Sequence, residues 1–147
     1  MPQIDKDYIK TGKAMFVLID SPLDFHKQAF KASEAAYCAG EQGRFWEMHD
    51  KIFAEQRSMG LDDLKRYAQA IGLDMQPFNQ CLDSNKYADK VQKGIAEARK
   101  VGVSGVPAFF IGYVENDGNV RAVKQLKGAQ PYAAFKEEIE KLLTEQK

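Results

Sequence analysis

The chain has 147 residues, of which 44% are hydrophobic and 29% charged, so it fits one soluble globular domain or one domain with an insertion. Its 21 Lys and Arg residues balance 21 Asp and Glu residues, which argues against a nucleic-acid partner held by a basic surface. No apolar run approaches the roughly 18 to 20 residues that cross a bilayer, so no membrane span or membrane partner is expected.

The first twenty residues predict a helix followed by a strand. Residues 2–11 place Ile4, Tyr8 and Ile9 on one helical face, and Gly12 ends the pattern. Residues 13–19 contain the unbroken apolar run MFVLI. Such a run is typical of a strand that is buried on both faces of a parallel sheet.

The middle of the chain predicts a series of helices. Apolar residues recur there at helical spacing, and Asp74 has the character of an N-cap. The aromatic residues Phe45, Trp46 and Phe53 are expected in the core. The expected helices cover residues 26–42, 44–55, 60–72, a stretch after Asp74, and 86–100.

The spacing of apolar residues changes from a helical to a strand-like pattern near Pro107. Residues 108–111 predict a buried strand, Asn116-Asp117-Gly118 a hairpin turn, and residues 120–126 the returning strand. Residues 132–145 predict a closing amphipathic helix. Helices placed between a first strand and a later hairpin indicate an α/β sheet with a helical insertion.

Four separated segments resemble the bacterial DsbA-like branch of the thioredoxin superfamily. They are residues 21–26 (SPLDFH), 35–46 (AAYCAGEQGRFW), 102–111 (GVSGVPAFFI) and 128–131 (GAQP). The resemblance covers essentially the whole chain. It implies a partial thioredoxin-like domain over 1–22 and 101–147, and an inserted helical domain over 23–100.

The resemblance also implies thiol–disulfide exchange, which forms or isomerises disulfides in protein or peptide substrates. Family members carry a Cys-x-x-Cys motif at a helix N-terminus, where the helix dipole stabilises the thiolate. The sequence contains no such motif, so we expect an N-terminally truncated, redox-inactive chain without catalytic residues. The central strand that precedes the motif in the family would be missing too, and we expect a homodimer to complete the sheet.

Val106 and Pro107 resemble the cis-proline dipeptide that faces the redox cysteines in this superfamily. There, the residue before the proline offers its backbone to a substrate peptide, so these two residues are the candidate substrate-binding site. The alternative is an ordinary trans proline at the start of a strand, because only about 5 to 6% of such bonds are cis.

Cys38 and Cys81 allow three interpretations: a structural disulfide in the helical insertion, two buried free thiols, or a catalytic role. Nothing places either cysteine at a helix start, which disfavours the third. The sequence has only two histidines, His26 and His49, to join them in a zinc site, so neither a metal nor a cofactor is expected.

Two classes of function follow. The first is the scaffold of a DsbA-like oxidoreductase, and the second is a non-catalytic thioredoxin-fold dimer or peptide-binding module. A glutathione-dependent relative is a weaker third. The resemblance implies a periplasmic or exported protein. No signal peptide is visible, so a cytoplasmic location is open, as is a mature or truncated form of a longer protein.

Overall fold

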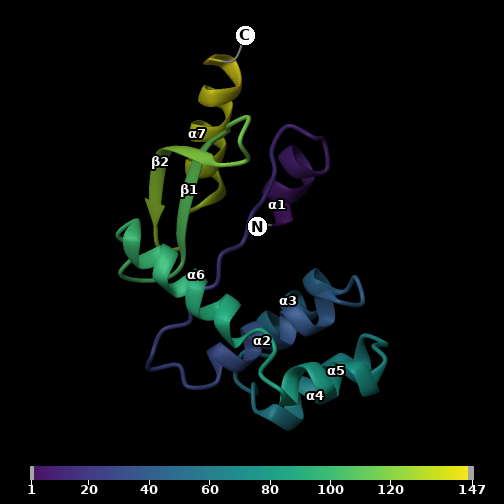
Figure 1. Cartoon of the computed structure of the whole chain (residues 1–147). Helices are drawn as coiled ribbons and strands as arrows, with labels where there is room; N and C mark the ends of the chain where they lie inside the picture. Colours follow the sequence, from purple (N-terminus) through teal and green to yellow (C-terminus); the bar gives the residue numbers. More distant parts are fainter. Residues whose placement is uncertain (1, 146–147) are drawn as a thin grey trace. The chain divides into compact units, whose positions relative to one another are not determined.

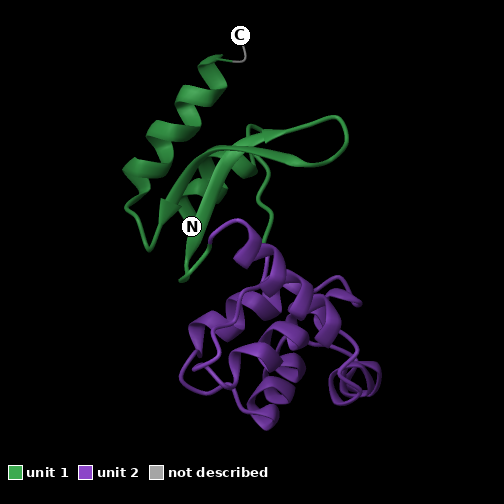
Figure 2. Ribbon diagram, turned by 60° about the vertical axis from the view of Figure 1, so that its left-hand side comes forward, with its two compact units in different colours: residues 1–18, 103–147 green, residues 19–102 purple. Residues whose placement is uncertain are grey.

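The computed structural model describes residues 2–145 and divides the chain into two compact units. One unit combines residues 1–18 with 103–147, and the other spans residues 19–102 (Figure 2). We call them the sheet unit and the helical unit. The ends of the sequence therefore meet in one unit, and the middle of the sequence forms the other.

The sheet unit is built on a hairpin of two antiparallel strands, β1 (Ala108–Val114) and β2 (Val120–Lys127) (Figure 1). Ala108 lies opposite Lys127 and Val114 opposite Val120, with a bulge after Ile111. Gly118 has a φ of 83° in the turn, a conformation that suits glycine. The predicted hairpin is confirmed, and both strands extend slightly beyond the predicted ends.

Helices cover one face of this hairpin. Helix α1 (Pro2–Ile4) continues into the π-helical turn η1 (Asp5–Ile9), and helix α7 (Tyr132–Glu145) closes the chain as predicted. The buried side chains of Ile4, Tyr8 and Phe135 form the centre of this core.

Alternate residues of β1 pack on the helices. Phe109 and Ile111 contact the buried cluster, and the ring of Phe109 meets the ring of Phe135 edge-on with centroids 4.8 Å apart. The hydroxyl of Tyr8 donates to Glu140 Oε1 at 2.8 Å, and the hydroxyl of Tyr132 donates to Asp7 Oδ2 at 2.6 Å. These two hydrogen bonds join the first and last helices of the chain.

The strand predicted over residues 13–19 is absent from the structure. The segment belongs to no sheet in the described residues, and alternate side chains are exposed: Met15 by 66%, Val17 by 57% and Ile19 by 59%. Because the run is apolar on both faces of an extended strand, it predicted that both faces would be buried. The prediction was wrong because, within the described residues, no strand pairs with this segment. No other part of the described chain covers its exposed side chains.

The helical unit has five helices in its described residues, as the sequence predicts. Asp74 caps one of them by accepting a hydrogen bond from the Gln76 N–H at 3.0 Å. The helices are α2 (Ala29–Gly40), α3 (Phe45–Ala54), α4 (Leu61–Ala70), α5 (Met75–Asp83) and α6 (Ala88–Lys100).

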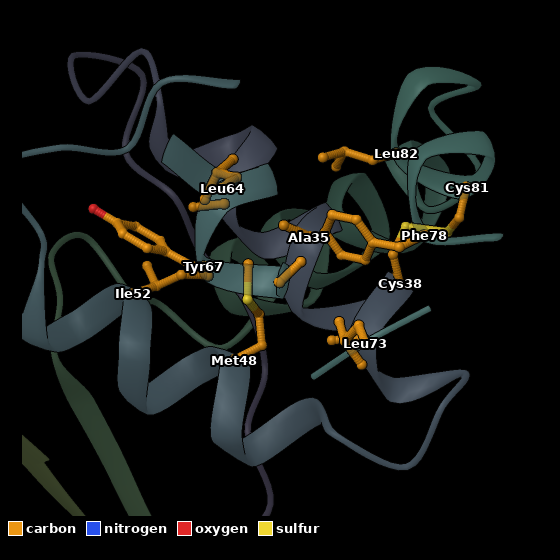
Figure 3. Close-up of a cluster of buried hydrophobic side chains, with 13 residues drawn as sticks. Ala35, Cys38, Met48, Ile52, Leu64, Tyr67, Leu73, Phe78, Cys81 and Leu82 are labelled. Carbon is orange, nitrogen blue, oxygen red and sulfur yellow. A yellow bond between two sulfur atoms is a disulfide. The ribbon is translucent and has the colours of Figure 1, made fainter. Parts of the chain in front are cut away.

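The core of the helical unit is tightly closed. Met48, Leu64, Phe78 and Leu82 have no measurable exposed surface. Figure 3 shows these side chains, which come from α3, α4 and α5, gathered around the small residue Ala35 of α2. Burial of this kind contributes roughly 1.5 to 3 kcal/mol for each large apolar side chain.

Candidate functional site

Val106 and Pro107 lie in the loop that leads into β1. The peptide bond between them is cis. The carbonyl of Pro107 accepts a hydrogen bond from the N–H of Gly128, just after β2, at 2.8 Å. This bond ties the start of β1 to the end of β2, so the rigid end of the hairpin positions the loop.

Val106 itself is open to solvent. Its side chain is 48% exposed, and its backbone N–H and C=O make no hydrogen bond within the described residues. A free donor and a free acceptor on one residue are what an extended peptide needs to pair with a strand edge. The two residues singled out from the sequence are thus adjacent and exposed, and the backbone of Val106 is available for pairing.

Cys38 and Cys81 form a disulfide between α2 and α5, with Cα atoms 5.8 Å apart. Both residues are buried, with exposed fractions of 1% and 4%, and they lie beside Phe78 in the core (Figure 3). Of the three interpretations that the sequence left open, the structure selects the disulfide. The bond links α2 to α5 within the core of the helical unit.

The histidines lie on the surface of the helical unit. The ring of His26 is tilted against the ring of Phe25 with centroids 4.4 Å apart, and Nδ1 of His49 lies 3.0 Å from Asp50 Oδ1. The described residues contain no group of three or more His, Cys, Asp or Glu side chains that could hold a metal ion.

Helix α3 has a stripe of aromatic residues whose exposure the sequence did not predict. Trp46 is 46% exposed and Phe53 63% exposed, whereas both were expected in the core. The ring of His49 lies between them, 5.4 Å from Trp46 and 4.6 Å from Phe53. These residues recur at spacings of three and four, which marks one helix face but does not say whether that face is covered.

Several shifted pKa values belong to structural contacts. Burial raises the pKa of Tyr8, and its hydrogen bond to Glu140 raises it further. Burial also raises the pKa of Tyr37, whose hydroxyl donates to Asp20. In contrast, the ammonium group of Lys86 lowers the pKa of Glu41.

The chain is similar to known proteins over nearly its whole length. A family model described as thioredoxin matches residues 1–141. The crystal structure of α-DsbA1 from Wolbachia pipientis, carrying two cysteine-to-alanine substitutions, superposes with a TM-score of 0.83 at 26% identity. That match covers 98% of this chain and 75% of the DsbA1 chain.

Parts of longer transport proteins are also similar. The Na(+)/H(+) antiporters NhaA 3 of Salinispora tropica and NhaA 1 of Salinispora arenicola are 41% and 40% identical to this chain over 88 residues. Those residues are 60% of this chain, and the match spans only 14% of each antiporter. No helix in residues 2–145 combines the length and the apolar character that spanning a bilayer requires.

Proposed function

This chain belongs to the thioredoxin family and has a DsbA-like fold, and from this we propose that it is the scaffold of a protein thiol–disulfide oxidoreductase that binds an extended polypeptide at Val106–Pro107. The observation that carries the proposal is the exposed Val106 with an unpaired backbone at the head of β1. A peptide laid there gains two backbone hydrogen bonds, and its side chains are left free to vary. Such a site suits a binder of many unfolded substrates.

We further propose that the chain as given does not exchange disulfides. Exchange begins when a thiolate attacks a disulfide sulfur, forms a mixed disulfide and expels the second sulfur as a thiolate. The sequence has no Cys-x-x-Cys, and its two cysteines are already joined in a buried bond. The groups that this chain contributes would hold the substrate rather than react with it.

A second candidate function is a non-catalytic peptide-binding module. The similarity to an 88-residue part of the antiporters favours this candidate, because in those proteins the similar stretch is one portion of a much longer chain. A module of this kind would use the same Val106 backbone. The two candidates differ in whether a redox-active cysteine pair ever acts on the bound peptide.

We propose an exported or periplasmic location. The DsbA-like fold supports it. The disulfide between Cys38 and Cys81 supports it as well, since disulfides persist in oxidising compartments and are rare in the cytosol. Quenching cells in acid and then labelling free thiols in the denatured chain with a maleimide reagent tests this proposal, because a reduced cytosolic chain would be labelled at both buried cysteines.

The binding proposal is tested with a fluorescent octapeptide of alternating apolar and polar residues, capped at both ends. Two N-methylated versions remove either the odd-numbered or the even-numbered backbone N–H groups. If the Val106 backbone pairs with the peptide, one version should bind at least about tenfold more weakly than the other. Val106→Ala keeps the backbone and should retain binding. Equal binding of both versions, or no binding to a folded chain, contradicts the proposal.

The redox proposal is tested by insulin reduction with dithiothreitol as the electron source. We expect the rate to match the rate without protein. A clear acceleration that survives replacement of both Cys38 and Cys81 by alanine would point to a contaminant, and one that is lost in this variant would overturn the proposal.

A further inference from the structure

The antiparallel ladder between β1 and β2 continues one step beyond its last residue pair, towards Val106. Ala108 lies opposite Lys127 at that end of the hairpin, and the next bond runs from the N–H of Gly128 to the carbonyl of Pro107 at 2.8 Å. The reciprocal bond cannot form, because proline has no N–H to donate. At this step of the ladder, a single hydrogen bond therefore holds the residue next to Val106.

The side chain of Gln130 supports this bond from the other end of the same peptide group. Its Nε2 donates to the carbonyl of Lys127 at 2.7 Å. That carbonyl and the N–H of Gly128 belong to one peptide group, which is planar and rigid. The group is thus held at both ends, since it accepts from Gln130 and donates to Pro107. Hydrogen bonds that are linked through one group polarise and strengthen each other.

Helix α7 fixes the position of Gln130. The next residue, Pro131, has a restricted φ, and its carbonyl accepts a hydrogen bond at 3.1 Å from the N–H of Ala134 in the first turn of the helix. Phe135 is buried and meets the ring of Phe109 of β1 edge-on. The backbone of Gln130 is therefore joined to the packed core of the sheet unit, although its own side chain is exposed.

We propose that Gln130 is a positioning residue for the peptide site. It holds the peptide group between residues 127 and 128, and this group holds the carbonyl of Pro107 and so sets the orientation of Val106. The inference rests on the peptide binding at Val106 proposed above. Without the Gln130 amide, the loop is free to leave the orientation that pairs with a peptide. The apparent affinity then falls in proportion to the fraction of molecules whose loop is in place.

Binding of the fluorescent octapeptide to the full chain tests the inference. Gln130→Met keeps the length of the side chain and removes its donor, and it should bind about fivefold more weakly, because one intramolecular hydrogen bond is lost. Gln125→Met is the matched control and should keep the wild-type affinity. Gln125 lies on β2 opposite Phe110. Because Phe109 and Ile111 pack on the helices, this pair lies on the other face of the hairpin, which we call the open face.

Amide hydrogen exchange followed by NMR separates positioning from a general loss of stability. In Gln130→Met, the N–H of Gly128 should exchange about fivefold faster, because its peptide group has lost one of its two hydrogen bonds. The N–H of Gly118 is the internal control. It donates to the carbonyl of Glu115 at 2.9 Å at the other end of the hairpin, and its exchange rate should stay unchanged. Circular dichroism checks that both variants are folded.

Failure of the proposed function and failure of this inference give different results. If the wild-type chain does not bind the octapeptide, peptide binding at Val106 is wrong, whereas faster exchange at Gly128 alone would still support Gln130 as the residue that holds the loop. An unchanged Gly128 rate in Gln130→Met overturns the inference, as does an unchanged affinity in a chain that binds the peptide. Equal acceleration at Gly128 and Gly118 overturns it too, because the substitution would then have loosened the whole hairpin.

Discussion

The helical unit and the sheet unit bury their apolar residues to different degrees. In the helical unit, Met48, Leu64, Phe78 and Leu82 are fully buried, and a disulfide ties two of the helices. In the sheet unit, the centre of the core retains a few per cent of exposed surface at Phe135. The helical unit has a centre without exposed surface, although Trp46 and Phe53 of α3 remain exposed, whereas helices of the sheet unit cover the hairpin on one face.

This difference indicates which unit is complete on its own. Helices satisfy their backbone hydrogen bonds internally, so a helical insertion needs only apolar packing to become stable. A sheet needs neighbouring strands as well as covers on its faces. The sheet unit, which carries the candidate binding site, is therefore also the unit whose strands have backbone groups available to a partner. Its stability is coupled to the binding of such a partner.

The largest effect should come from removing the disulfide of the helical unit. Replacing both Cys38 and Cys81 by alanine should lower the free energy of unfolding by about 4 kcal/mol, because the bond closes a loop with a sequence separation of 43. Urea unfolding followed by circular dichroism measures this change. The wild-type chain in dithiothreitol is the control and should lose a similar amount. A loss below about 1 kcal/mol would show that the helical unit does not depend on the bond.

The two faces of the hairpin give a sharper comparison within one unit. Phe135→Ala should cost about 3 kcal/mol, since it removes a buried ring from the covered face. Phe110→Ala on the open face should cost less than about 1 kcal/mol at low protein concentration. Parallel urea titrations of the two variants measure both values. Equal costs would mean that the open face is as well packed as the covered one.

The elements could be predicted from sequence wherever their signals were local. The closing helix begins at Tyr132 and ends at Glu145 as predicted, and Asp74 caps its helix. Periodicity and capping depend on residues within one or two turns, so they need no knowledge of the rest of the fold.

The exposed segments could not be predicted in the same way. Residues 15–19 have the composition of a buried strand, yet Met15 and Val17 are exposed because nothing in residues 2–145 covers their side chains. Trp46 and Phe53 have core-like spacing and lie on an open helix face. Whether an apolar face is covered depends on distant parts of the chain or on other molecules, and a single sequence does not record that. The pairing of Cys38 with Cys81 was likewise one of several possibilities until the helices were placed.

Smaller effects than that of Phe135→Ala should come from two tyrosines, the buried Tyr8 of the sheet unit and the half-buried Tyr37 of the helical unit. Tyr8→Phe removes the hydrogen bond to Glu140, and Tyr37→Phe removes the one to Asp20. Each substitution should lower the free energy of unfolding at pH 7 by about 1 kcal/mol. A difference between the two losses would show which unit depends more on its tyrosine.

The pH dependence identifies the cause. Folding raises the pKa of both tyrosines, because burial and a nearby carboxylate favour the neutral phenol. Their contribution to stability is therefore complete below about pH 10, the pKa of an unfolded tyrosine, and is lost as the pH rises above it. Unfolding titrations between about pH 9 and 11, one unit either side of that value, should show a shallower alkaline decline in each variant than in the wild-type chain. If a variant keeps the wild-type slope, the fold does not hold the hydroxyl of the replaced tyrosine in its neutral form. The hydrogen bond of that tyrosine then contributes little to stability.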